Sequence, residues 1–274
     1  MTPLVRKTLL CFGWLCLAGG AWAQDAGLGE VWRNLADRQN TAAQLALAAT
    51  PASAGRERQL AEAVVKLGRQ PVTQATLREA EGELAQLAQG NDELAAQAGY
   101  LQARVWSVHM QTPDYARAAE LYRALAKRFP TNHWARLGLV KLGMLTLYTL
   151  PEPADPLMRL RTVETMMPAV AEPPLQRDLN LQLARAAVLF GRPETETLVY
   201  LKAVDRVGGL VGLVAEEVVL QLGELSLRVG RLDESKAYFE RFLRDFPTNN
   251  RGYNVTLKLQ EIAARQHAAK GGQP

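Results

Sequence analysis

The chain repeats a block of its own sequence, and this internal repeat limits the folds open to it more than any other feature. Residues 115–142 and 232–259 match at a constant offset of 117 residues, and both contain Phe-Pro-Thr-Asn. A third copy, residues 190–200, matches residues 229–239 at an offset of 39, which is one third of 117. Self-similarity at a period of about 20 to 50 residues is typical of solenoids and other repeat arrays. The period of roughly 39 residues therefore predicts a stack of similar units.

Clusters of Gly, Pro and small polar residues divide each period into two halves. One set lies at 71–73, 112–114, 151–156, 191–193 and 230, and a second set lies midway, at 90–92, 130–132, 168–174, 208–209 and 247–250. Between them the apolar spacing is helical, as at Val219, Leu222, Gly223 and Ser226. Asp114 and Asp233 stand where helices should begin and can accept hydrogen bonds from free amides. The pattern predicts an all-α fold of about five helix pairs over 55–247, a closing helix over 249–269 and one N-terminal helix over 28–49.

The best-formed repeat resembles a tetratricopeptide repeat. Leu222 and Gly223 match the Leu-Gly pair of its first helix, Ser235 the small residue where the helices cross, and Phe239 the aromatic that fills the next gap. Residues 100–130 are similar, with Ala118 and Tyr122 at these last two positions, although Trp106 replaces the glycine. The resemblance implies a right-handed α-solenoid over 55–269. It is shared with repeat proteins of the Gram-negative envelope, such as the Tol-Pal coordinating protein and the outer-membrane assembly lipoproteins.

The first 23 residues have the three parts of a secretory signal peptide. Arg6 and Lys7 precede an apolar run from Leu9 to Leu17, and the small-x-small tripeptide Ala21 to Ala23 predicts cleavage before Gln24. The apolar run is shorter than the roughly 20 residues that a membrane span needs. We therefore expect no integral span in the mature chain and a periplasmic or secreted location. Residues 24–54 form a predicted N-terminal helix and linker that either caps the array or mediates self-association, and 270–274 are a predicted disordered tail.

Composition argues against several classes of function. Without Arg6 and Lys7 the 32 basic residues fall to 30 against 28 acidic residues, a near balance that argues against nucleic acid as a partner. Both cysteines lie in the predicted signal segment, and His109, His133 and His267 lie far apart in sequence. These features favour neither a metal site, nor a cofactor, nor thiol chemistry. We expect a protein without enzymatic activity, and a hydrolase on a helical scaffold is the weakest alternative.

The first helix of each pair should line one surface of a solenoid, and this surface suits an extended peptide or a partner helix. The repeat register places polar side chains of three first helices there. The predicted partner-binding residues are Tyr100, Arg104, Ser107, Asp178, Gln182, Arg185, Glu217, Gln221, Glu224 and Arg228. Trp32 and Trp134 adjoin polar residues, so each is either a core residue or an exposed anchor for a partner.

These observations predict a scaffold or adaptor that binds a protein or peptide of the envelope, in envelope assembly or division. A structural subunit of a larger secretion or outer-membrane complex is the main alternative. An adaptor keeps its binding surface open, whereas a subunit covers that surface permanently. The sequence leaves the partner and the oligomeric state open.

Overall fold

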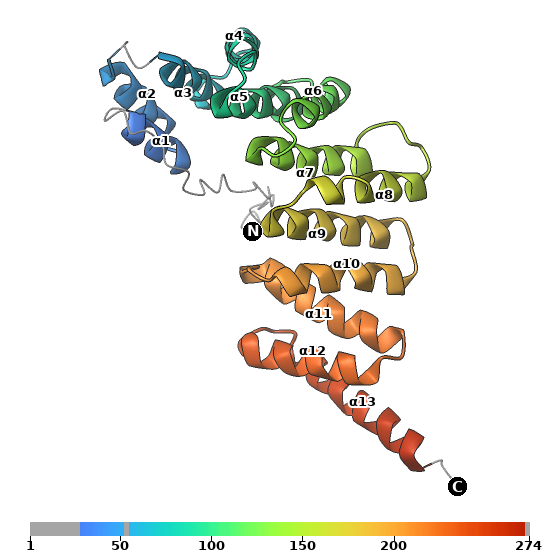
Figure 1. Ribbon diagram of the computed structural model, residues 1–274. Helices are drawn as coiled ribbons and strands as arrows, with labels where there is room; N and C mark the ends of the chain where they lie inside the picture. Colours follow the sequence, from blue (N-terminus) through green and yellow to red (C-terminus); the bar gives the residue numbers. More distant parts are fainter. Residues whose placement is uncertain (1–27, 52–54, 272–274) are drawn as a thin grey trace, which may run out of the picture. The chain divides into compact units, whose positions relative to one another are not determined.

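The computed structural model describes residues 28–51 and 55–271, and every regular element in these ranges is a helix (Figure 1). The predicted signal segment and residues 272–274 lie outside the described residues. The chain divides into two compact units, residues 1–90 and 91–274. Among the described residues, no helix is both long enough and apolar enough to cross a membrane. The predicted all-α class is confirmed for this part of the chain.

The described residues of the first unit, 28–51 and 55–90, form four helices. They are α1 (Leu28–Ala36), α2 (Asn40–Ala49), α3 (Gly55–Gly68) and α4 (Gln74–Leu87). The prediction of one continuous helix over 28–49 is wrong, because the chain turns at Arg38, whose φ is +60°. A core of Leu28, Val31, Leu47 and Val65 joins α1 and α2 to α3, and Trp32 packs against it, half-buried.

Over residues 91–271, the second unit contains nine α-helices and two short irregular turns of helix. The α-helices are α5 (Glu93–Arg104), α6 (Tyr115–Arg128), α7 (His133–Tyr148), α8 (Pro156–Glu164), α9 (Pro173–Leu189), α10 (Glu194–Val207), α11 (Gly212–Arg228), α12 (Leu232–Asp245) and α13 (Gly252–Gly271). A π-helical turn, η2 (Val105–His109), continues α5, and a 3-10 turn, η3 (Met167–Ala169), follows α8. Consecutive helices pack on one another in chain order (Figure 1).

The predicted five pairs and closing helix are present, as α3/α4, α5/α6, α7/α8, α9/α10, α11/α12 and α13. Each predicted cluster of breakers lies at a junction between two helices, although Pro156 already begins α8 and residues 173–174 already belong to α9. Carboxylates and amides end several of these turns by capping the next helix: Asp92, Asp114, Asn132 and Asp155 each accept a hydrogen bond from a first-turn amide. Asp233 instead lies in the first turn of α12 and accepts a hydrogen bond from Gln266. Helix α13 extends two residues into the predicted tail.

Polar contacts within the second unit separate two layers of helices. On one side, Arg185 of α9 pairs with Glu217 of α11, and Lys258 of α13 pairs with Glu224 of α11. On the other side, Lys202 and Asp205 of α10 pair with Glu234 and Arg241 of α12. The odd-numbered helices are therefore neighbours along one layer and the even-numbered helices along the other. We call the solvent-exposed side of α5, η2, α7, α9, α11 and α13 the first-helix face.

Helices α11 and α12 lie close together at Gly223. A Cβ placed on Gly223 would lie 2.6 Å from the ring of Phe239, which is fully buried. Beside this contact the buried hydroxyl of Ser235 donates a hydrogen bond of 2.8 Å to the Gly223 carbonyl. Only a residue without a side chain lets the ring lie against the backbone of α11, which explains why Gly, Ser and Phe occur together here.

Replacing Gly223 with alanine should destabilise the second unit by about 1 to 3 kcal/mol, because the ring and the helices must move apart to admit a methyl group. The control is Gly82→Ala in α4, where nothing lies within 4 Å of the added carbon. That change should stabilise α4 by about 0.5 to 1 kcal/mol through helix propensity. Urea unfolding followed by circular dichroism, with hydrogen exchange of α4 and α11, measures both. Equal stability of the two variants would contradict the packing argument.

Candidate functional site

The predicted partner-binding residues lie on three first helices of the second unit. Arg104 ends α5 and Ser107 lies in η2. Three more lie on α9: Asp178, Gln182 and Arg185. Four lie on α11: Glu217, Gln221, Glu224 and Arg228. All nine are half-buried or exposed. Within each helix they recur at spacings of three or four residues, so each set lies along one side.

Tyr100, the tenth predicted residue, is only 2% exposed. Its ring packs against Tyr122 and Trp134, with ring centroids 6.0 and 5.5 Å away. This burial removes Tyr100 from the candidate binding surface. Trp134 is also buried, at 7% exposed, so the interpretation of Trp134 as an exposed anchor is wrong.

The contacts of its ring give the reason for the burial of Tyr100, since Tyr122 and Trp134 both lie against it. Its counterpart at the 117-residue offset, Glu217, is half-buried, whereas residues 101–105 keep the burial pattern of residues 218–222. The π-helical turn η2 follows α5: Met110 donates its amide hydrogen to Val105, so the turn holds one residue more than an α-helical turn. The repeat register of α5 is therefore kept, and Tyr100 departs from it in burial alone.

Adjacent first helices are joined by side chains of the predicted set. Arg185 lies 3.7 Å from Glu217, and Gln221 donates a hydrogen bond of 3.2 Å to the same carboxylate. Arg228 pairs with Glu194 of α10 at 3.1 Å. These groups are between about a third and a half exposed, so they form a hydrated, charged surface that a partner can contact without disturbing the core.

The middle of this face carries an acceptor without a donor. The side-chain oxygen Oε1 of Gln182 is buried and has no hydrogen-bond partner within the described part of the chain. The Tyr148 hydroxyl donates to the main-chain carbonyl of Gln182 at 3.1 Å and leaves the side chain of Gln182 unsatisfied. Buried polar atoms are rarely left unpaired, so this amide is a candidate contact for a ligand or an ordered water.

Lys141 of α7 is a member of the first-helix face that sequence reasoning missed. It is half-buried, and its pKa is lowered first by burial and then by Arg104, while Asp178 raises it. The signal that points to it is the internal repeat, because Lys141 and Lys258 occupy matching positions at the offset of 117 residues. The helical face of α7 did not reveal it, since α7 is apolar on most sides.

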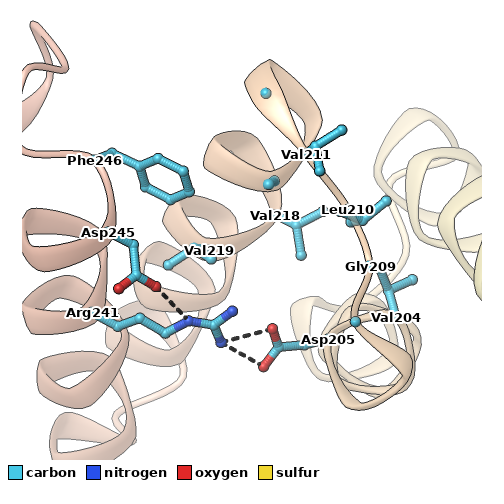
Figure 2. Close-up of a pocket in the computed structure, with 13 residues that line it drawn as sticks. Val204, Asp205, Gly209, Leu210, Val211, Val218, Val219, Arg241, Asp245 and Phe246 are labelled. Carbon is cyan, nitrogen blue, oxygen red and sulfur yellow. Dashed lines mark hydrogen bonds and ion pairs between the residues drawn. The ribbon is translucent and has the colours of Figure 1, made fainter.

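A pocket of about 280 Å³ lies between α10, α11 and α12 (Figure 2). Its walls include Val204, Val218, Val219 and Phe246, and its charged groups are paired with one another. Arg241 donates to both carboxylate oxygens of Asp205, at 2.8 and 3.0 Å, and to Asp245 at 3.3 Å. Figure 2 shows the guanidinium between the two carboxylates. This pocket is therefore a weaker candidate, because its polar groups hold α10 against α12.

Within residues 28–51 and 55–271, no group of three or more His, Cys, Asp and Glu side chains is placed to hold a metal ion. Of the histidines, His133 bonds Glu172 at 2.6 Å, and His109 is half-buried near Arg104. The chemistry that the described face can perform is recognition of polar and charged groups.

Comparison of the chain with protein-family models, with curated proteins and with solved structures gave no match. The candidate site therefore stands on the geometry of this chain alone.

The stability of the second unit should fall as the pH drops from 6.5 to about 4. Burial, and after it the charge of Arg104, lowers the pKa of His109 from 6.5 to about 4. In that window the unfolded chain binds a proton that the folded chain excludes, and above pH 6.5 this group has no effect. His109→Gln should lose less thermal stability than the unmodified chain on going from about pH 7.5 to about pH 5. His267→Gln on exposed α13 is the control, and an equal benefit from both variants would contradict this assignment.

Proposed function

We propose that this chain is a non-enzymatic scaffold or adaptor that binds a protein partner, in the form of an extended peptide or a helix, on its first-helix face. The observation that supports this most is the recurrence of half-buried and exposed polar side chains at matched positions of three first helices, α5 with η2, α9 and α11. A surface that repeats at the period of the fold can contact a long ligand several times. The layer of second helices is joined by its own ion pairs and supports this surface.

The proposal includes a right-handed solenoid of tetratricopeptide-like repeats. The packing of Phe239 on Gly223, with Ser235 beside it, joins three positions of the resemblance. In the earlier copy Tyr122 packs against Gly138 of the following helix, and Ala118 is fully buried. Export to the bacterial periplasm, with a role in envelope assembly or division, follows from the signal-like segment and from the resemblance.

Exposed apolar side chains favour one alternative, a structural subunit of a larger secretion or outer-membrane complex. Val188 and Leu189 at the end of α9 are 58% and 67% exposed, and Tyr253 on α13 is 73% exposed. Contiguous apolar surface is commonly covered by another chain. A subunit of this kind should aggregate when purified alone, whereas an adaptor should remain a soluble folded protein.

Photo-crosslinking at single positions tests the proposed face. A benzoylphenylalanine residue in place of Gln182 or Gln221 probes the first-helix face, and one in place of Arg123 or Lys236 probes exposed positions on α6 and α12. We expect a discrete adduct with one partner, identified by mass spectrometry, from the first pair of positions only. Adducts of equal yield from all four positions, or none from Gln182 and Gln221, would overturn the proposal.

Truncation of Arg185 and Arg228 together to alanine should weaken capture of that partner without lowering thermal stability appreciably. Their side chains are 48% and 57% exposed, and their ion pairs are solvated. Loss of such pairs costs about 0 to 1 kcal/mol each. The measurements are partner capture and thermal unfolding of the same preparation. A collapse of stability would instead identify the two arginines as packing residues.

A further inference from the structure

The two matching blocks of the chain differ in charge at three positions of the first-helix face. At the offset of 117 residues, Gln221, Glu224 and Lys258 of the later block correspond to Arg104, Ser107 and Lys141 of the earlier block. The later set contains one anion and one cation and is neutral. The earlier set contains two cations and no anion, so the same structural position carries a charge of +2.

In the later block the lysine has a carboxylate partner within the chain. Lys258 of α13 lies 3.9 Å from Glu224 of α11, and both side chains are about a third exposed. In the earlier block the residue that corresponds to Glu224 is Ser107, whose hydroxyl donates back to the Ala103 carbonyl at 3.2 Å. Replacement of a carboxylate by a hydroxyl removes the counter-charge of Lys141.

No other carboxylate of the described residues takes the place of Glu224 by forming an ion pair with Arg104 or Lys141. Over the described ranges, no Asp or Glu oxygen lies within 4.0 Å of either cation. The acid whose charge reaches Lys141 is Asp178, and Arg177 already bonds its carboxylate through two nitrogens at 3.0 Å each. By contrast, Arg185, Arg228 and Lys258 on the same face all have carboxylate partners.

Arg104 ends α5 and Lys141 lies on α7, and these two helices pack directly on one another. Two half-buried cations on neighbouring helices are unfavourable without an anion. Burial and the charge of Arg104 both lower the pKa of Lys141, and the same two causes lower the pKa of His109, which stays neutral beside them. An anion bound between Arg104 and Lys141 would relieve the repulsion and gain charge-assisted hydrogen bonds from a guanidinium and an ammonium.

We propose that Arg104 and Lys141 form a subsite for a carboxylate of an acidic segment of the partner protein. This proposal rests on the proposed function, because it assigns a chemistry to part of the first-helix face. The later block indicates the class of anion: there the fold itself places a glutamate carboxylate against the matching lysine. The partner's Asp or Glu side chain takes the role that Glu224 has within the chain.

Three single substitutions with the same change in net charge test the subsite. Lys141→Gln removes a cation of the subsite, Ser107→Glu supplies the missing carboxylate from within the chain, and Lys258→Gln removes a cation that is already paired. The probe is a peptide of six glutamates with an acetylated amino end and an amidated carboxyl end, and the matching peptide of six glutamines is its control. Binding to the full chain is measured by calorimetry.

Lys141→Gln and Ser107→Glu should each weaken binding of the hexaglutamate peptide by about tenfold or more, the loss expected for one charge-assisted contact. Lys258→Gln should change the affinity by less than about twofold, since the net charge falls equally but the subsite is intact. The glutamine peptide should not bind. In addition, Ser107→Glu should raise the pKa of Lys141, read from the ¹³Cε shift of the lysine, because it restores the counter-charge.

Equal effects of Lys141→Gln and Lys258→Gln, or no binding of hexaglutamate to the unmodified chain, would overturn the subsite. Displacement of the peptide by inorganic phosphate at lower concentration than by acetate would show that the site selects phosphate, which also overturns the assignment to a protein carboxylate. If crosslinks from Gln182 persist while the peptide series fails, the subsite alone is wrong. If the peptide series succeeds and no crosslinks form, the proposed partner function is wrong and the anion site remains.

Discussion

The contact between Phe239 and Gly223 sets how closely the two helices of a pair approach, and the packing of the second unit depends on it. The ring lies against bare backbone and the Ser235 hydroxyl satisfies the carbonyl next to it, so the apolar contact costs no unpaired polar group. A helix pair held this way still has an apolar side that it cannot bury alone. Val219, Leu220 and Leu227 of α11 and Phe242 of α12 meet Val255 and Ile262 of the closing helix in one cluster. Each pair is therefore completed by its neighbour, and the array requires a terminal helix.

The dependence of each helix pair on its neighbour limits the positions at which the sequence can change. The contacts between pairs fix the apolar sides of the helices, which leaves their solvent-exposed sides, including the first-helix face, free to vary without loss of packing. Three pairs of matching residues illustrate this freedom to vary: Arg104 and Gln221, Ser107 and Glu224, and Lys141 and Lys258. The fold keeps their positions while their charge changes from neutral to +2. Recognition can thus differ from one repeat to the next although the scaffold is the same.

The sequence predicted the helix pairs because Gly and Pro clusters and helical apolar spacing act locally. Ser235 and Phe239 were predicted to be packing residues, and both are fully buried. The contact of the Phe239 ring with Gly223 of the same pair was not predicted, because the repeat pattern places this ring toward the next repeat. The break at Arg38 was missed because no Gly or Pro marks it, and a non-glycine residue adopts the left-handed conformation there. The burial of Tyr100 was missed because the repeat register matches it to half-buried Glu217, whereas its ring packs on Tyr122 and Trp134, contacts that the register does not reveal. Lys141 could not be assigned from the sequence, because its role depends on the groups around it. The structure shows that Arg104 acts on Lys141 and that no carboxylate of the described residues forms an ion pair with it.

The π-turn at Val105–His109 has a consequence for any ligand that follows the array. Residues of α9 and α11 present their side chains with a common angular phase, so a helical or extended ligand with a matching repeat can meet equivalent atoms on both. The π-turn interrupts the α-helical spacing where α5 ends, because it holds one residue more than an α-helical turn. A strictly periodic ligand that matched α9 and α11 would not find the same spacing at Val105–His109, so these two parts of the array are not equivalent for it.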